Sequence, residues 1–572
     1  MNIDLIKTTI SDFKTYLETY VSMFLCGSKK TLISGLLFLI ALTLQSQTVS
    51  KVWVADNGDG TYKNPIINAD YSDPDAIRVG DDYYMVSSSF NHIPGLPILH
   101  SKDLVNWKII GHALKKQPPY DVYDWVQHGA GVWAPSIRYH NNEFYIYYPD
   151  PDFGIYLVKA KNINGPWSEP LLVEAGKGLI DPCPLWDDNA SPNVEGGRGK
   201  TYLVHAYAGS RAGIKSIIVV KEMNKEGTKT IGNGVMVYDG HENDPTIEGP
   251  KFYKRNGYYY IFAPGGGVST GWQTVLRSKK IYGPYERKVV LDQGSTTVNG
   301  PHQGAWVTTQ TGEDWFLHFQ DKEAYGRVVH LQPMKWIHDW PVIGADQDQD
   351  GKGEPVLSYR KPNVRKQFPR STVQDSDEFN ETKFGLQWQW QANPKEGWAY
   401  ATPNGSLRMF SVYQPDSNNN LWNLPNILGQ KFPAEEFKVT VKVSFKPKFE
   451  NERFGLIVLG TDYAVLSLIK KKDSIYLVQS ENLNADKNKV EKPISAIPVG
   501  SNEVFLKLKV SKGGVCDFSY ETGKAQGHLL KTFTAKPGRW VGAKIGMFCT
   551  RTNVTNDAGY ADLDWVRIEK ID

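Results

Sequence analysis

A recurring order of apolar and polar positions divides residues 48–345 into five similar segments. Each segment has a small or acidic residue beside Pro or Gly, then an apolar strand, a tight turn and a strand rich in Tyr or Phe. Two antiparallel strands joined by a hairpin, with further strand after them, are typical of one propeller blade. The pattern therefore predicts a five-bladed β-propeller. A β-sandwich also supplies short strands, but it does not repeat one strand opening in this way.

The rest of the chain predicts a second all-β domain. Apolar and polar residues alternate at 438–445 and 504–510, which indicates strands with one buried face. A β-sandwich over residues 374–572 fits this pattern best. Residues 346–373 are rich in Gly, Pro and charge and are predicted to link the two domains.

The N-terminus predicts export. Lys29 and Lys30 precede an apolar run over 32–44, the order found in a secretory signal, and we assign residues 1–47 to it. The run is short for a bilayer span, although a retained anchor or a buried helix is the alternative. We expect a periplasmic or extracellular protein with no membrane span after signal removal.

Composition narrows the partners. The net charge is +3, from 65 basic and 62 acidic residues, so no broad field would attract nucleic acid. Aromatic residues make up 12% of the chain, which favours β-structure, flat faces for stacking on sugars, or both. The four cysteines form no disulfide framework; Cys516 and Cys549 either pair or stay as separate buried thiols.

The five segments carry reactive side chains at one equivalent position, the residue that opens the first strand of each segment. The innermost strand of each blade lines the central channel, so the residues that open these strands are expected to converge on its axis. Three carboxylates and a histidine would then meet at one end of the channel. The five opening positions are Asp73, Ala134, Asp181, Glu248 and His302.

Such a group of carboxyls suits cleavage of a glycosidic bond, in which one protonates the leaving oxygen and another activates water or attacks the anomeric carbon. An ionised Asp181 near Glu248 would keep Glu248 protonated as an acid. Asp73, held by hydrogen bonds, would be the base. Asp70 and Asp75 are rival bases by nearness in sequence, but Asp73 shares with Asp181 the position directly before Pro.

At this point the chain resembles glycoside hydrolase family 43, the five-bladed β-xylosidases and α-L-arabinofuranosidases. The resemblance implies base, pKa-tuning acid and general acid at Asp73, Asp181 and Glu248, with inversion of configuration and carboxyls about 6.5–9.5 Å apart. It requires no cofactor for the chemistry. The segments that carry it are Asn64-Pro65-Ile66, Asp73-Pro74, Arg78-Val79-Gly80-Asp81-Asp82-Tyr83-Tyr84, His100 to Trp107, Val132-Trp133-Ala134-Pro135-Ser136-Ile137, Ile180-Asp181-Pro182, Glu248-Gly249-Pro250 and Gly257-Tyr258-Tyr259-Tyr260.

The resemblance also implies residues around the acids. His302 is similar to an axial histidine that contacts a cation in several members, or else it is hydrogen-bonded in the channel without metal. Arg327 would contact substrate hydroxyls or form a surface salt bridge. Phe90 and Trp133 match aromatic walls of the sugar pocket, with plain core packing as the alternative.

The C-terminal domain is similar to the concanavalin-like domain attached to many β-xylosidases of this family. It would help to close the pocket and favour attack at chain ends, or it would be an independent carbohydrate-binding module that uses exposed aromatics such as Trp388, Trp390 and Trp398. Glu378 and Asp564 are candidate ligands of a structural calcium, with simple surface acids as the alternative.

One acidic loop also bears on calcium. Asp346-Gln347-Asp348-Gln349-Asp350-Gly351 begins like a calcium loop, but Leu357 stands where the closing Glu belongs, and a solvated acidic linker is the alternative.

These observations predict an exo-acting inverting hydrolase that releases pentose from hemicellulose-type oligo- or polysaccharides. A β-xylosidase is the first interpretation and an α-L-arabinofuranosidase the second. A non-catalytic glycan-binding propeller is the alternative from another class, although a pure binder has no need of a proton donor.

Overall fold

The computed structural model describes residues 49–188, 199–414, 420–523, 525–528 and 531–571. The signal predicted over 1–47 lies outside these ranges and stays a prediction. Within them, no helix has both the length and the apolar character needed to cross a bilayer.

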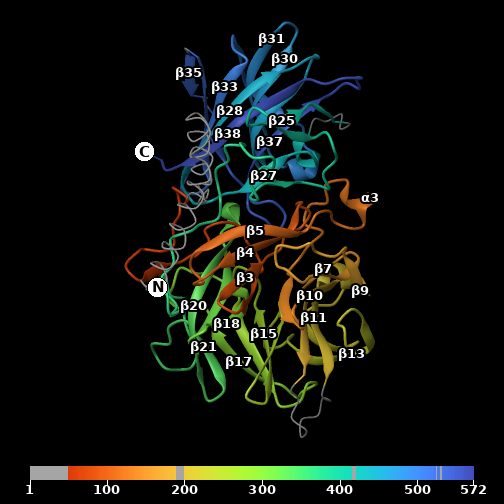
Figure 1. Cartoon of the computed structure of the whole chain (residues 1–572), viewed down its shortest axis with the longest axis vertical. Coiled ribbons are helices and arrows are strands. Elements are labelled where there is room, and N and C mark those ends of the chain that lie inside the picture. Colours follow the sequence, from red (N-terminus) through yellow and green to blue (C-terminus); the bar gives the residue numbers. More distant parts are fainter. Residues whose placement is uncertain (1–48, 189–198, 415–419, 524, 529–530, 572) are drawn as a thin grey trace, which may run out of the picture. The chain divides into compact units, whose positions relative to one another are not determined.

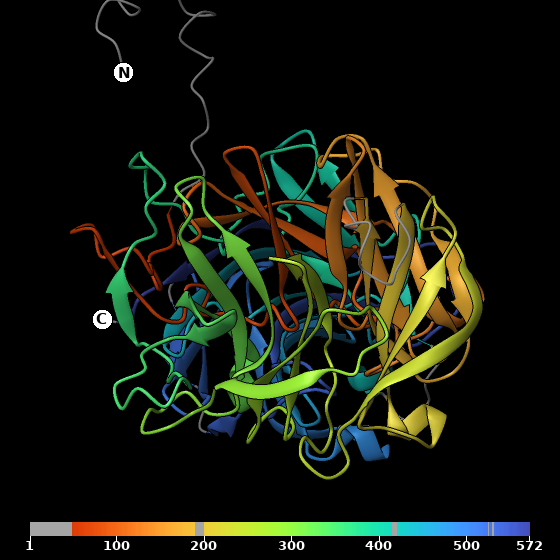
Figure 2. The same cartoon turned by 90° about the horizontal axis from the view of Figure 1, so that it is seen from below.

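The first part of the chain is a five-bladed β-propeller, as predicted. Five antiparallel sheets each consist of four strands consecutive in sequence. Figure 2 shows these sheets grouped around a common centre. The blades are β2 (Asp75–Val79), β3 (Asp82–Val86), β4 (Gly95–Ser101) and β5 (Trp107–Leu114); β6 (Ser136–His140), β7 (Glu143–Asp150), β8 (Gly154–Ala160) and β9 (Leu171–Ala175); β10 (Leu179–Asp187), β11 (Lys200–Tyr207), β12 (Ile217–Met223) and β13 (Thr230–Asp239); β14 (Lys251–Arg255), β15 (Tyr258–Gly265), β16 (Trp272–Ser278) and β17 (Glu286–Leu291); and β18 (His302–Thr308), β19 (Asp314–Asp321), β20 (Arg327–Ile337) and β21 (Trp340–Ile343).

Among the described residues, the first and last blades are joined without any blade that combines strands from the two ends of the propeller. The chain ahead of the first blade runs along β20 of the last one, where Ile67 and Val329 exchange backbone hydrogen bonds. Leu331 donates its N–H to the Asn64 side chain at 2.9 Å, and Asn64 Nδ2 donates back to its carbonyl. This pairing carries residues 70–73 past the start of β20 and so fixes which side chains of the first and last blades meet.

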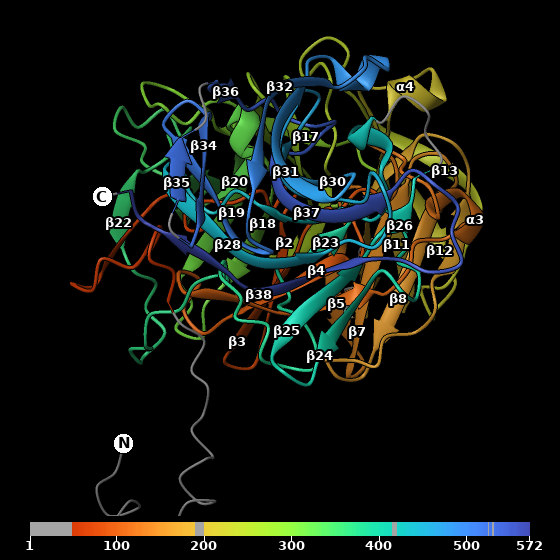
Figure 3. The same cartoon turned by 90° about the horizontal axis from the view of Figure 1, so that it is seen from above.

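The C-terminal part is a β-sandwich of two eight-stranded sheets, also as predicted. Strand β28 alternates buried and half-buried residues along nearly its whole length, because only one face meets the core. In Figure 3, β28 and β38 run side by side in one of the sheets. That sheet holds β24 (Ala399–Thr402), β25 (Ser406–Phe410), β28 (Phe437–Lys446), β33 (Glu503–Ser511), β34 (Val515–Thr522), β35 (Ala525–His528), β36 (Phe533–Thr534) and β38 (Tyr560–Glu569), and the other holds β23 (Gln389–Trp390), β26 (Val412–Tyr413), β27 (Leu428–Lys431), β29 (Arg453–Leu459), β30 (Tyr463–Lys471), β31 (Ser474–Asn482), β32 (Lys492–Val499) and β37 (Lys544–Arg551).

Helical structure in the described residues is limited to single turns. They are α3 (Tyr120–Tyr123), which is labelled in Figure 1, α4 (Gly209–Ala212) and the 3₁₀ turns η1 (Glu323–Tyr325), η2 (Leu421–Asn423) and η3 (Ala485–Lys487).

One alternative for the sandwich is wrong: Trp388, Trp390 and Trp398 are buried in its core and present no exposed face for sugar. Of the two alternatives left open for Cys516 and Cys549, the structure has the separate buried thiols. Alternation alone could not decide the first point, because a tryptophan at a strand end suits a core and a binding surface equally well.

The segment predicted as a linker packs on the propeller. Its strand β22 (Ser358–Arg360) pairs with β1 (Thr61–Lys63), and Gly353 exchanges backbone hydrogen bonds with the end of the fourth blade.

Propeller and sandwich belong to one unit, residues 49–572, and share backbone hydrogen bonds. Ile93 and Trp390 form a two-way bridge with N···O distances of 2.9 and 2.6 Å. On the other side of the boundary, Ala543 donates its N–H to the carbonyl of Ala324, within η1, at 2.7 Å. These contacts attach the sandwich to loops of the propeller on two sides.

Candidate active site

Asp73 and Asp181 share an unusual backbone conformation. Their φ angles are 55° and 56°, in the left-handed region that non-glycine residues seldom occupy. Asp73 lies two residues before β2, and Asp181 lies in β10 at a break in register between Ile180 and Cys183. A bulge of this kind re-aims a side chain, and strained residues of this kind cluster at active sites. The two residues that the sequence places in register therefore also agree in backbone geometry.

Asp73 is buried against a cation and a hydroxyl. Its Oδ2 accepts a hydrogen bond from Ser88, and its Oδ1 lies 3.3 Å from Nη1 of Arg327. Arg327 is buried too, so the pair is an internal contact and the surface salt bridge considered for Arg327 is excluded. These contacts suit a carboxylate that carries negative charge.

Asp181 lies beside the backbone of Glu248. Its Oδ2 accepts the N–H of Gly249 at 2.7 Å. Burial, followed by the charge of Glu248, raises the pKa of Asp181 well above its usual value, and the charge of Asp73 acts in the same direction. Two neighbouring carboxyls do not both ionise readily when one of them is buried. The electrostatic coupling that the sequence predicted between Asp181 and Glu248 is therefore present, and it acts on the pKa of Asp181.

Glu248 is the more accessible of the two acids. Its side chain is 23% exposed, and its Oε1 lies 3.0 Å from Nε2 of His302. His302 is fully buried, and its Nδ1 has no partner among the described residues. That atom is available to water or to the axial cation that the family resemblance implies.

Three aromatic side chains border this group. Phe90 packs edge-on against Trp133 with ring centroids 6.4 Å apart, and Trp133 meets Trp540 of the sandwich at 6.0 Å. The Arg327 guanidinium lies 5.8 Å from the centroid of Trp540. Trp540 is half exposed, whereas Phe90 is buried. The sandwich thus contributes an aromatic ring next to the carboxyls.

The rival bases have other contacts. Asp75 is fully buried, with Oδ2 2.7 Å from Arg138 and 2.8 Å from the N–H of Ile137. Asp70 accepts the backbone N–H groups of Arg327 and Gly542. Asp70 and Oδ2 of Asp75 are occupied by the protein's own donors, Oδ1 of Asp75 is buried without a partner among the described residues, and Asp73 is the one of the three that contacts the Arg327 side chain.

A groove of about 940 Å³ continues from Arg327 and Trp540 along the boundary with the sandwich. Its lining combines polar and charged side chains, among them Gln320, Asp321, Glu323 and Lys512, with the rings of Tyr325 and Trp540. Such a mixed surface suits a sugar, which presents both hydroxyls and an apolar ring face.

The predicted calcium ligands are not brought together. Glu378 forms a two-pronged pair with Arg567 at 2.7 and 2.8 Å, and Asp564 lies 2.6 Å from Lys442. Each carboxylate faces a protein cation.

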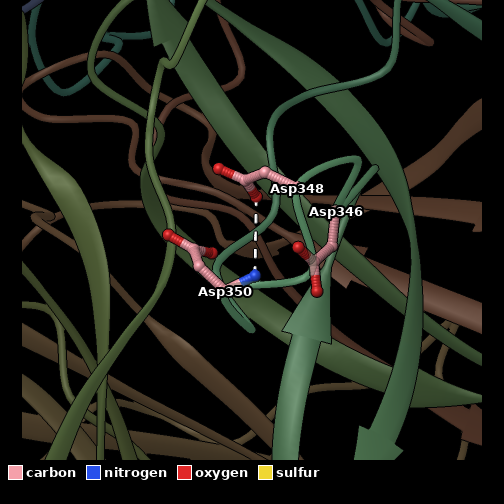
Figure 4. A group of neighbouring side chains, drawn as sticks. All are labelled: Asp346, Asp348 and Asp350. Atoms are coloured by element: carbon pink, nitrogen blue, oxygen red, sulfur yellow. Dashed lines mark hydrogen bonds between the residues drawn. The ribbon is translucent and has the colours of Figure 1, made fainter.

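The acidic loop does bring its three aspartates together. One carboxylate oxygen each of Asp346, Asp348 and Asp350 lies within 4.8 Å of the others. Figure 4 shows the three side chains around one turn of the chain. The N–H groups of Asp350 and Gly351 point back at Asp348 and Asp346. The arrangement is that of a tight acidic turn, and it lies apart from the carboxyls of the channel in sequence and in its contacts.

Sequence reasoning missed two residues. Ser88 lies in a run of three serines, where nothing singles out one hydroxyl. Trp540 follows Asp73 by hundreds of residues and belongs to another domain. Only the fold places either side chain at the site.

Comparisons with known proteins agree with this geometry. Residues 62–341 match the family model described as glycosyl hydrolases family 43, and residues 376–569 match the β-xylosidase C-terminal concanavalin A-like domain. A Xylanibacter ruminicola protein to which β-xylosidase activity is provisionally ascribed is 42% identical, over 75% of this chain and 76% of its own length. A β-xylosidase of Formosa agariphila is 32% identical, over 89% and 90%. A non-reducing-end α-L-arabinofuranosidase of Bacteroides ovatus is 29% identical, over 90% and 95%.

A solved structure is similar across both domains. The crystal structure of the family 43 BlXynB protein of Bacillus licheniformis superposes with a TM-score of 0.75 at 28% identity, covering 89% of this chain and 100% of that one.

Proposed function

Because this chain belongs to glycoside hydrolase family 43, we propose that it is an exo-acting β-xylosidase that releases xylose from the ends of xylan-type oligosaccharides by inversion. The two relatives that reach 32% and 42% identity bear β-xylosidase names, which favours this sugar over arabinose. Their names also favour an enzyme over a non-catalytic binding propeller. No cofactor takes part in the chemistry of this family.

One observation carries the assignment of roles. Asp181 is buried beside Glu248, and burial and the charge of Glu248 raise the pKa of Asp181, whereas Asp73 contacts Arg327 and Ser88, which suit a negative charge. An acid and a base are thereby distinguished by their surroundings. Glu248 is the donor of its pair because it is the more exposed carboxyl and can reach a bound substrate.

The reaction then follows in one displacement. Asp73 takes a proton from water as the water oxygen bonds to the anomeric carbon. The glycosidic bond breaks, and its electron pair takes the proton of Glu248, so that the shortened chain leaves as an alcohol. Asp73 ends protonated and Glu248 ionised, and exchange with solvent restores both. Separation of the two carboxyls by about 6.5–9.5 Å would leave room for this water.

Neighbouring side chains would orient the sugar. Arg327 is placed to donate hydrogen bonds to ring hydroxyls while it holds Asp73. Phe90 and Trp133 would form the wall against which the apolar face of the ring packs. Trp540 narrows the entrance from the sandwich side, which favours a chain end over an internal unit. The polar groove beyond it would accept the leaving part of the chain.

The proposal is tested by turnover of matched aryl glycosides. Protein lacking residues 1–47 is assayed with 4-nitrophenyl β-D-xylopyranoside and α-L-arabinofuranoside, beside Glu248→Ala and Asp73→Ala. Faster release from the xyloside, abolished by Asp73→Ala, is expected. A faster arabinofuranosidase rate would reassign the sugar, and binding of xylo-oligosaccharides without turnover by any form would favour the binding protein.

A calcium ion, where one binds, would serve structure. His302 offers Nδ1 to an axial cation, and the loop of Asp346 is the other candidate place. Metal content measured by atomic emission, before and after chelation, with the melting temperature followed in parallel, tests whether any of these is occupied.

We also propose that the enzyme acts outside the cytoplasm after removal of the signal within residues 1–47. N-terminal sequencing of the protein recovered from a secreting host would give the processed start, and an N-terminus that still carries the apolar run over 32–44 would contradict export by this route.

A further inference from the structure

One buried carboxylate joins the two parts of the active site that come from different domains. Asp70 is 5% exposed. Its Oδ1 accepts the N–H of Arg327 and its Oδ2 accepts the N–H of Gly542, both at 2.9 Å. Arg327 opens β20 of the propeller, whereas Gly542 lies in the sandwich two residues after Trp540. A single side chain therefore holds the backbone of the arginine that contacts Asp73 and the backbone of the loop that carries Trp540.

The backbone is packed closely around the Asp70 carboxylate and its two N–H donors. Gly326 has a φ of 73°, and a Cβ added to it would lie 2.4 Å from Cγ of Asp70. A Cβ added to Gly542 would lie 2.6 Å from the N of Gly326. Only glycine fits at both positions, so the propeller turn, the sandwich loop and the carboxylate are in direct contact.

Two lysines of the sandwich lie near Asp70, of which Lys544 is buried and Lys431 half-buried. Burial lowers the pKa of Lys431 to about 8, burial and the charge of Lys431 lower that of Lys544 to about 7, and the charge of Asp70 raises both. The Lys431 ammonium also lies 4.7 Å from the ring of Tyr71, the residue after Asp70. A carboxylate that accepts two backbone N–H groups beside cations makes charge-assisted bonds, which are the stronger kind.

We propose that Asp70 is a positioning residue for catalysis, which sets Arg327 and Trp540 at a fixed separation across the domain boundary. Arg327 and Trp540 lie 5.8 Å apart, guanidinium carbon to ring centroid, and both border the sugar pocket of the proposed function, on which this inference rests. A displacement of about 1 Å at such a site costs on the order of 10²-fold in rate. The sandwich would then be part of the catalytic unit and not a separate module.

Asp70→Asn tests this with almost no change of shape. The amide keeps one acceptor but turns an NH₂ group toward one of the two N–H donors, so one half of the bridge is lost. We expect kcat/KM for xylobiose to fall about ten-fold or more, mainly through KM, in protein that is fully folded by circular dichroism. In a Trp540→Ala background the same substitution should cost much less, because part of what Asp70 positions is already gone.

The matched control is Asp377→Asn. Asp377 is also a buried carboxylate that accepts backbone N–H groups, those of Phe379 and Gly385, but all its partners lie within the sandwich. Asp377→Asn should lower the melting temperature and leave kcat/KM unchanged. The inference would be overturned if Asp70→Asn also lowered only the melting temperature. It would likewise be overturned if Asp70→Asn lowered kcat/KM equally in the wild-type and Trp540→Ala backgrounds.

Two further arms keep the test decisive. If the wild type has no turnover, the proposed function fails, and the inference about catalysis fails with it. If Asp70→Asn does not fold, hydrogen exchange of the wild type decides: the amides of Arg327 and Gly542 should exchange far more slowly than that of Trp540, and fast exchange at either would contradict the bridge.

Discussion

Asp181 accepts the N–H of Gly249 through Oδ2 at 2.7 Å, which fixes it beside the residue that follows Glu248. This hydrogen bond does not compensate for burying the negative charge of Asp181. Burial and the charge of Glu248 together raise the pKa of Asp181 well above its usual value. The cost of holding Asp181 in this place depends on pH.

An unfolded aspartate titrates near pH 3.9, and the folded one titrates higher, so the native state binds the extra proton. The contribution of Asp181 to stability is complete below about pH 4 and is lost as the pH rises through its folded-state pKa. Asp181→Asn keeps an oxygen for Gly249 and carries no charge. We expect the melting temperature of Asp181→Asn, measured relative to the wild type, to rise by roughly 2–4 °C as the pH is raised from 4 to 8. Turnover should fall.

Asp187→Asn is the control for this prediction. Asp187 is buried on the same strand but is paired with Lys254 and Tyr259, so the same substitution there should lower the melting temperature at pH 8. A constant difference between Asp181→Asn and the wild type across pH would show that Asp181 does not carry the raised pKa.

Glu248→Gln should depend strongly on the leaving group. A sugar alcohol is a poor leaving group without a proton, so hydrolysis of xylobiose should fall by about 10²–10⁴-fold. A nitrophenolate leaves without protonation, so release from 4-nitrophenyl β-D-xylopyranoside should fall by about ten-fold or less. The ratio of the two losses, measured on one protein preparation, is the diagnostic quantity. Equal losses on both substrates would remove Glu248 from the role of acid.

Asp73→Asn should instead abolish both reactions to a similar extent, because every substrate needs an activated water. The loss should again be about 10²–10⁴-fold, with substrate binding retained. The stereochemistry of the wild type checks the same step: proton NMR in the first minutes should show α-xylose formed from a β-xyloside. Initial formation of the β-anomer would mean that Asp73 acts as a nucleophile in a retaining mechanism.

Much of the fold follows from the sequence because it depends on local, repeated signals. The opening dipeptide at Asp73-Pro74 recurs at Asp181-Pro182, and the turns between strands recur with it, so five blades could be counted. The alternation over 438–445 likewise gave a strand of the sandwich. These patterns arise from one strand or one hairpin at a time.

The remaining features depend on contacts between distant segments. Nothing in the sequence distinguishes Ser88 from Ser87 and Ser89, or Trp540 from the buried Trp388. The left-handed backbone of Asp73 and Asp181 also cannot be read from the sequence, because aspartate, although enriched in that region, adopts it in only a minority of positions. Even the rival base Asp70 has a role that only the fold could assign, since its two donors lie 257 and 472 positions away in the chain.

Trp540→Ala tests whether the sandwich takes part in substrate binding. The ring is 50% exposed and borders Trp133 and Arg327, so its removal should cost binding and little stability. Loss of one aromatic contact with a sugar, worth about 1.4 kcal/mol, would raise KM for xylobiose about ten-fold. Tyr400→Ala is a matched control, because Tyr400 is a 52% exposed aromatic of the same domain that packs on Phe410. We expect the melting temperature of both variants to stay within a degree or two of the wild type and only Trp540→Ala to change KM. An unchanged KM for Trp540→Ala would assign the entrance of the pocket to the propeller alone. The contribution of the sandwich would then no longer be a reason to expect attack at chain ends.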